Sequence, residues 1–230
     1  MSRKTEINFE YTIVRSKRRT VAIHIDQGVV VRAPFRARES QITNFLIQKS
    51  PWILKKLEVV NQRAAESPHH TFQDRDTFLF QGVPHVLRLV EASKTSIEIH
   101  DMEIFLNIKP GTPPEKIPEK MKKWYIKKAR EKMNQRVEYY SEKIGKKPKK
   151  IAIRGQSKRW GSCSSKGNIN LNWKLIMAPE EILDYVVAHE VCHLLHPNHS
   201  NKFWHTLETI MPDYEARRNW IKQNGHKLGF

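Results

Sequence analysis

The sequence has 230 residues, of which 39% are hydrophobic, so it can bury a core and is not a disordered chain. The 41 basic residues outnumber the 24 acidic ones, and the net charge of +17 favours anionic partners without identifying one. No apolar run approaches the ~18 residues of a membrane span, and the first ten residues, MSRKTEINFE, lack the apolar stretch of a signal peptide. We therefore expect a cytoplasmic protein without membrane contacts, in which Cys163 and Cys192 are reduced.

Residues 1–110 are predicted to form a β-rich region that contains two helices. The strand segments show either alternation of apolar and polar residues or a short apolar run, and they are residues 7–14, 20–26, 29–34, 78–90 and 96–108. A turn at Asp26, Gln27 and Gly28 joins the second segment to the third. The last two segments each have the pattern of a hairpin of two short strands.

The two helices of this region are expected between the third and fourth strand segments. Ser40 can cap a first helix through residues 41–49. A second helix is expected to begin at Ser50 with Pro51 at its first position, where the missing N–H of proline does no harm.

A proline-rich stretch, residues 109–118, predicts a boundary, and we expect a second domain over residues 111–230. A long helix should begin at about Glu119, with a core-facing seam formed by Met121, Tyr125, Ala129, Met133, Val137, Tyr140 and Ile144. A strand over residues 148–155 and two strands within residues 158–177 follow. The next segment, EEILDYVVAHEVCHLL after Pro179, is predicted to be an amphipathic helix.

His189, Glu190 and His193 form the pattern HExxH within this helix. Residues four apart share one face of a helix, so the two imidazoles can bind one Zn²⁺ ion at about 2.0–2.1 Å. Glu190 can then act as the general base on a water molecule without being a ligand. The apolar residues before the motif bury the helix, and buried polar groups need partners, which favours a metal. Cys192 points elsewhere and is interpreted as a small apolar core residue.

His199 is the predicted third ligand. His196 lies on the same helical face as the first two histidines, but three ligands in a line cannot form three corners of a tetrahedron. Pro197 disfavours helical geometry at His196, so the helix should end about there. Asn198 can adopt a left-handed turn that returns His199 to the site from off the helix axis.

Glu208 or Glu215 is the alternative third ligand, while His196 and His205 are expected outside the ligand set. Three protein ligands leave a fourth position for water, which is typical of a catalytic zinc and not of a structural one.

Three segments together resemble the YgjP-like zinc metallopeptidases, which are related to the SprT and Wss1 proteases. They are RWGSCSSKGNINLN over residues 159–172, HEVCHLLHPNHS over residues 189–200, and the following Phe203 and Trp204. The resemblance is looser in the N-terminal half, through VRAP and WILKKL. It implies an α+β fold in which a β-rich N-terminal part precedes a minimal zincin-like domain. It also implies that His189, His193 and His199 bind zinc and that Glu190 is catalytic.

The strand before the HExxH helix usually lines the substrate cleft in a zincin and can pair with an extended polypeptide. Trp160, Ser162 and Cys163 are therefore candidates to contact substrate, although Trp160 could also be a plain core residue.

The region from Lys143 to Pro179 contains ten lysines and arginines and no acidic residue. Lys158 and Arg159 directly precede the candidate cleft strand, where they could bind a carboxylate or a phosphate. The structural alternative for Arg159 is an ion pair with Asp184.

These features leave three functions open. The first is a zinc metallopeptidase acting on a polypeptide, with a basic surface that could also bind nucleic acid. The second is a zinc hydrolase of a nucleotide or another phosphate compound, although the chain lacks a glycine-rich phosphate loop. The third is a nucleic-acid-binding module with a structural zinc, against which the free coordination position and Glu190 argue.

Overall fold

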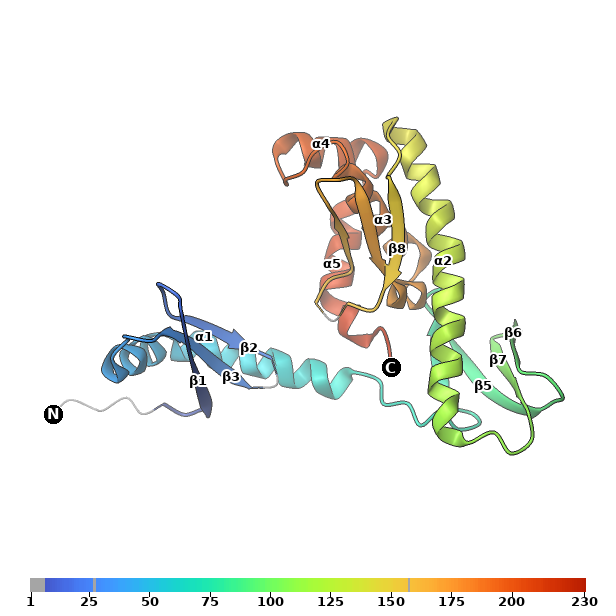
Figure 1. The fold of residues 1–230 in the computed structure, drawn as a ribbon, viewed down its shortest axis with the longest axis horizontal. Helices are drawn as coiled ribbons and strands as arrows, with labels where there is room; N and C mark the ends of the chain where they lie inside the picture. The colour runs from blue at the N-terminus through green and yellow to red at the C-terminus, as the bar shows by residue number, and fades with distance from the viewer. Residues whose placement is uncertain (1–6, 27, 157) are drawn as a thin grey trace. The chain divides into compact units, whose positions relative to one another are not determined.

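The computed structural model describes residues 7–26, 28–156 and 158–230, so Gln27 of the predicted turn lies outside the described residues. The fold is α+β, as expected (Figure 1). Its contacts divide the chain into two units, Met1–Ser67 and Pro68–Phe230, and not at the predicted boundary of residues 110 and 111. The reason is that the strands of residues 77–108 bury Phe78, Leu87 and Ile104 in the same core as the later helices.

The first unit is a three-stranded sheet covered by one helix. The strands β1 (Tyr11–Ser16), β2 (Ala22–Ile25) and β3 (Val29–Pro34) have the order β1-β3-β2, with β1 parallel and β2 antiparallel to β3. The three predicted strand segments are thus confirmed, although the first strand begins only at Tyr11. Alternate residues of β3 pack against the helix in a small core of Val29, Val31, Ala33, Ile42, Leu46 and Ile53.

The helix of this unit, α1 (Glu39–Glu66), is continuous through Pro51, so the prediction of two helices is wrong. Ile42 and Ile53 lie on either side of the proline and are buried in the same core. Their burial offsets the backbone hydrogen bond that proline cannot donate. Ser40 is not the N-cap of this helix, because the N-cap position is occupied by Arg38. The backbone N–H of Arg38 donates a hydrogen bond to the Gln41 side chain, at 3.1 Å.

The second unit begins with a four-stranded sheet. Its strands β4 (Thr77–Phe80), β5 (Val83–Glu91), β6 (Ser96–His100) and β7 (Glu103–Ile108) have the order β4-β5-β7-β6. The antiparallel pairs β4–β5 and β6–β7 confirm the two predicted hairpins, and β5 runs parallel to β7 where the hairpins join.

The turn of the first hairpin contacts the segment that precedes the HExxH helix. The backbone N–H groups of Gln81 and Gly82 donate to the carbonyls of Ile176 and Met177, at 2.8 and 3.0 Å. Gly82 has φ +81°, and a Cβ there would lie 2.8 Å from Cγ of Pro179. Glycine is required at this position for both reasons, and the contact fixes where the next helix starts.

The predicted long helix is α2 (Ile117–Ile144), and it buries the predicted seam apart from the partly exposed Ile144. It packs against α3 (Glu180–Cys192) and the short helix η2 (Trp173–Met177). Asp184 of α3 accepts two hydrogen bonds from the Arg136 guanidinium of α2, at 2.5 and 2.6 Å. Asp184 therefore pairs with Arg136 and not with Arg159, and this partly buried bidentate pair orients α3 on α2.

The strands β8 (Lys150–Arg154), β9 (Gly161–Cys163) and β10 (Asn168–Asn172) confirm the predictions for this region. They form a second sheet of order β8-β10-β9, in which β9 is an edge strand that contacts α3. Two helices follow α3, namely α4 (Asn201–Ile210) and α5 (Tyr214–Asn224) (Figure 1). None of the helices in the described ranges is long and apolar enough to cross a membrane.

Candidate metal centre

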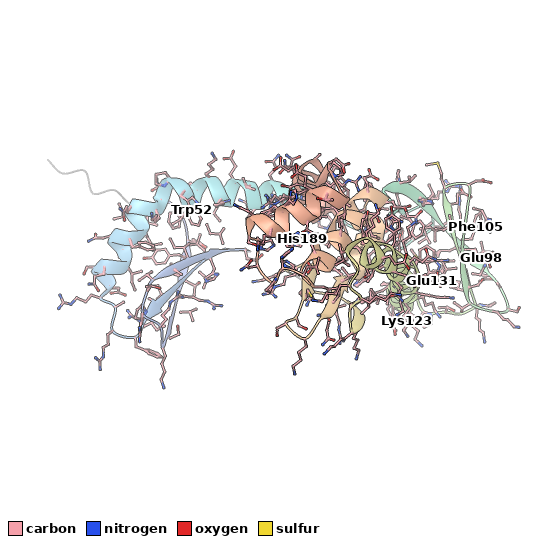
Figure 2. All side chains as sticks on the ribbon, turned by 90° about the horizontal axis from the view of Figure 1, so that it is seen from above. Trp52, Glu98, Phe105, Lys123, Glu131 and His189 are labelled. Atoms are coloured by element: carbon pink, nitrogen blue, oxygen red, sulfur yellow. The ribbon has the colours of Figure 1, made fainter. Side chains whose placement is uncertain are left out.

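Three imidazoles converge at the end of α3. One ring nitrogen from each of His189, His193 and His199 lies within 4.8 Å of the other two, and no other such group of metal-ligand residues occurs in the described ranges (His189 is labelled in Figure 2). The Nε2 atoms of His189 and His199 are 3.0 Å apart. Two ligands of one tetrahedral zinc are separated by about 3.3 Å, so these two nitrogens already have nearly the spacing that a shared zinc ion requires.

The backbone after α3 brings His199 back to the helix. The α-helix ends at Cys192, earlier than expected, but a helical turn continues because the N–H of His196 donates to the carbonyl of Cys192, at 3.0 Å. Asn198 is not among the residues with positive φ, so the predicted left-handed conformation is wrong. The chain reverses through residues 196–200 with ordinary backbone angles, and α4 starts directly afterwards.

Neighbouring groups hold the rings in place. Nδ1 of His193 lies 2.9 Å from the carbonyl of His196, an arrangement that leaves Nε2 free for a metal. The ring of His196 itself turns away, to the hydroxyl of Thr206 at 3.1 Å. The fully buried Phe203 packs against all three imidazoles of the cluster, with ring centroids 4.6–4.9 Å apart. His196 therefore supports the cluster without joining it.

The protonation states of the cluster suit a cation. Burial, together with the neighbouring His193 and His199, lowers the pKa of His189 to about 3, and burial also lowers the pKa of His199. Both rings are therefore neutral near pH 7, as metal ligation requires. Nδ1 of His189 is buried and has no hydrogen-bond partner among the described residues, so the polar contacts of this ring lie on its Nε2 side.

Glu190 is buried beside the cluster and packs directly against β9. Glu190 is only 6% exposed. Burial raises the pKa of Glu190 to about 8, an effect that the positive charge of Arg159 partly opposes. A Cβ on Gly161 would lie 2.6 Å from both Cγ and Oε1 of Glu190. Only glycine at this point of the edge strand lets the carboxylate lie where it does.

The remaining candidates for metal ligation lie outside the cluster. Neither Glu208 nor Glu215 belongs to it, and His205 is exposed on α4. Cys192 is buried, as expected for an apolar core residue, and its thiol is free.

A pocket of about 300 Å³ opens beside His189 and Glu190. It is lined by residues of three elements and of the segment before β9, namely Lys158, Arg159, Trp160, Gly161, Tyr185, Val186, Arg218, Ile221 and Lys222. Three of the predicted substrate residues, Lys158, Arg159 and Trp160, are thus brought together in this pocket. Ser162 is not, because its hydroxyl accepts a hydrogen bond from the Asn170 side chain, at 3.3 Å, and Cys163 lines a different pocket.

Gly161, Tyr185 and Arg218 are among the residues of this site that were not predicted from the sequence. Gly161 lies between two predicted contact residues, and Tyr185 precedes His189 by one helical turn, so spacing could have indicated both. Arg218 comes from α5, and its guanidinium lies 4.8 Å from the ring centroid of Trp204. No local pattern around Arg218 marks it, because only the packing of α5 on α3 brings it to the pocket.

A family model of the YgjP-like metallopeptidase domain matches residues 17–224. The chain belongs to the YgjP-like family. This finding confirms the resemblance of residues 159–172 and 189–200, and it extends the family match over most of both units. The family is one of metallopeptidases, so the chain is classed as a hydrolase. Membership of this family implies a bound metal and suggests a polypeptide substrate.

The other comparisons add little to the YgjP-like assignment. The metallopeptidase zymogen of Pyrococcus abyssi abylysin, a crystal structure, is similar over 42% of this chain and 99% of its own, with 20% identity and a TM-score of 0.37. No curated protein matches the chain.

In the metal-free YgjP-like protein, Glu190→Gln is expected to raise stability in alkaline solution. The folded-state pKa of about 8 lies above the unfolded value of 4.5, so stability is lost as pH rises from 4.5 through 8. Glutamine cannot ionise and removes this loss. The free energy of unfolding of the variant, measured by urea denaturation with chelator present, should exceed that of wild type by a few kcal/mol at pH 9.

At pH 4.5 the two metal-free proteins should differ little, because the carboxyl group is protonated in the folded state and only half ionised in the unfolded state, which changes the free energy of unfolding by only about 0.4 kcal/mol. A difference of the same size at both pH values would show that packing, and not ionisation of Glu190, separates them.

Proposed function

We propose that this YgjP-like protein is a zinc-dependent peptidase of the zincin type, in which His189, His193 and His199 bind the metal and Glu190 is the general base. The observation that supports this most is the convergence of three imidazoles beside one buried carboxylate. When bound, zinc supplies the Lewis acidity that activates water and polarises a carbonyl. A buried carboxylate with a raised pKa is suited to take a proton from water near neutral pH.

Glu190 acts twice in this proposal. It accepts the proton of the attacking water, and it then delivers that proton to the nitrogen of the leaving amine. Arg159 lines the same pocket and lowers the pKa of Glu190 by its positive charge, so it keeps part of the Glu190 population ionised. The nearby cation would shift this balance further towards the carboxylate.

The edge strand β9 is the proposed binding site for the polypeptide. Edge strands offer unpaired backbone groups to an extended chain. Trp160 and Gly161 place one end of this strand beside Glu190, and Cys163 is at the other end. Tyr185 lines the same pocket, and in this proposal its hydroxyl donates to the substrate.

The two alternatives predicted in the sequence receive no comparable support. A phosphate hydrolase and a nucleic-acid-binding module both draw on the basic residues near the metal centre. Lys158 and Arg159 do line the pocket at Glu190, but carboxylates of a polypeptide satisfy them as well as phosphates do. The family match favours the peptidase.

Metal removal tests the proposal. The purified protein should hydrolyse an unfolded protein such as reduced casein, and incubation with a chelator should abolish the activity, because the Lewis acid is lost. One equivalent of Zn²⁺ should restore it. Nucleoside triphosphates, assayed in parallel, should not be hydrolysed. Phosphate release that follows zinc occupancy, without peptide cleavage, would contradict the proposal.

Gly161→Ala is expected to reduce peptide hydrolysis by about 10- to 100-fold, because an added Cβ would displace the Glu190 carboxylate and small misplacements of catalytic groups are costly. Zinc content should stay at one equivalent. The matched control is Ser162→Ala on the same strand, which should retain most of the activity. The measurement is kcat together with metal analysis, and a Gly161→Ala protein with wild-type kcat would remove the steric argument.

A further inference from the structure

A second pocket, of about 570 Å³, adjoins the metal centre at His193. Four lysines line it, together with Cys163, Ser164, Ser165 and Gly167 of the β9–β10 hairpin. We call it the lysine pocket, defined by Lys146, Lys147, Lys149 and Lys166. None of its described lining residues is acidic, so four positive charges surround one concave site next to a cluster that fits a cation.

The lysine charges are not compensated within the described part of the chain. Three lysines of α2 do have acidic partners, since Lys123, Lys128 and Lys132 form ion pairs with Glu119, Glu131 and Glu180. By contrast, the four lysines of the pocket have no carboxylate within ion-pair distance among the described residues. The Nζ atom of Lys146 donates a hydrogen bond to the carbonyl of Leu194. Mutual repulsion of these charges would be relieved by an anionic ligand.

The edge strand connects this pocket to Glu190. Gly161 packs against the Glu190 carboxylate, and Cys163, two residues along β9, lines the lysine pocket. Two residues of an extended strand span about 7 Å. A polypeptide paired with β9, with the cleaved bond near Glu190, would therefore place a side chain about two residues away in the lysine pocket.

This geometry favours a polypeptide over a nucleic acid as the anionic ligand. The backbone amides and carbonyls of an edge strand pair with those of another polypeptide, and alternate side chains then enter pockets on one face. A phosphodiester backbone has no donors with which to continue such pairing. In addition, the lysine pocket opens directly beside the metal centre and does not lie on a separate face.

We propose that the lysine pocket is a specificity subsite that binds an aspartate or glutamate side chain of the substrate, about two residues from the bond that is cleaved. The proposal rests on the proposed peptidase function. The enzyme would then prefer acidic segments of polypeptide, and this preference would come from Lys146, Lys147, Lys149 and Lys166. All four lysines are exposed, and no polar contact within the described residues ties the side chains of Lys147 and Lys166 to the fold.

A charge-swap experiment tests the subsite through catalysis. Matched peptides with glutamate, glutamine or lysine at each position near a single cleavage site are compared by kcat/KM. For wild type, we expect glutamate to be preferred over lysine by about 5- to 30-fold at one position, with the preference shrinking at high salt. The double variant Lys147→Glu/Lys166→Glu should reverse that preference. The matched control Lys94→Glu/Lys127→Glu, with the same change of charge at exposed residues outside both pockets, should keep it.

Binding to zinc-loaded Glu190→Gln protein separates this proposal from the proposed function. Fluorescence anisotropy of a labelled acidic peptide should show tighter binding than its lysine counterpart, and the charge swap should reverse the order. If no peptide is cleaved but this reversal is seen, the peptidase function fails and the subsite stands. Equal binding and cleavage of acidic and basic peptides by wild type overturns the subsite. Displacement of the peptide by an oligonucleotide of equal charge at a lower concentration overturns the polypeptide as its occupant.

Discussion

Glu190→Gln is expected to lower kcat for peptide hydrolysis by at least about 100-fold while leaving zinc bound. Glutamine keeps the size and shape of the side chain, so it fits against Gly161 as the glutamate does. Its amide cannot accept a proton from water, and loss of a positioned general base typically costs a factor of 10²–10⁴. The measurement is steady-state cleavage of a fluorogenic peptide together with metal analysis of the same sample.

The control for this variant is its metal content and its melting temperature with zinc bound. Both should stay close to wild type, because Glu190 is not a proposed ligand. If the variant keeps near wild-type turnover, Glu190 has no part in proton transfer. If turnover and zinc are lost together, Glu190 acts through the metal site and not as a base.

His199→Ala is expected to weaken zinc binding by more than about 100-fold. Loss of a residue that merely supports a ligand costs 10- to 100-fold in affinity, and loss of a ligand should cost more. The residue is exposed at the end of a turn, so the fold should tolerate the change. The measurement is competition for zinc with a chromophoric chelator of known affinity.

Two matched variants make the ligand test specific. His205→Ala alters an exposed histidine on α4 that lies outside the cluster, and it should bind zinc as wild type does. Glu208→Ala should likewise leave zinc affinity unchanged. Full zinc binding by His199→Ala, with loss of zinc in Glu208→Ala, would move the third ligand to Glu208.

Patterns within single elements were predictable from the sequence. Alternation along β3 and the helical spacing along α2 depend on which face of an element is buried, and short-range periodicity reports this directly. The same holds for His189, Glu190 and His193, because their mutual placement follows from one turn of helix. His199 could also be predicted, since the chain must reverse after Pro197, although the conformation expected for Asn198 was wrong.

The domain division and the course of α1 were not predictable in this way. The proline-rich residues 109–118 mark only a connection, whereas the core shared by Phe78 and Ile104 with α2 places the preceding sheet in the second unit. Pro51 is a helix breaker locally, and burial of side chains on both sides of it keeps α1 intact. In both cases a tertiary contact outweighs a local preference.

What the sequence by itself determined is therefore the chemical content of the centre, namely three imidazoles and one carboxylate at a spacing set by one helix and one turn. Only the tertiary structure decided what surrounds that centre. It places Gly161 against Glu190, brings Arg218 from α5, pairs Asp184 with Arg136, and gathers four lysines into one pocket beside His193. The physical reason is that these contacts join residues of different elements, whose meeting depends on how the buried faces of α2, α3 and β9 pack and not on any local spacing.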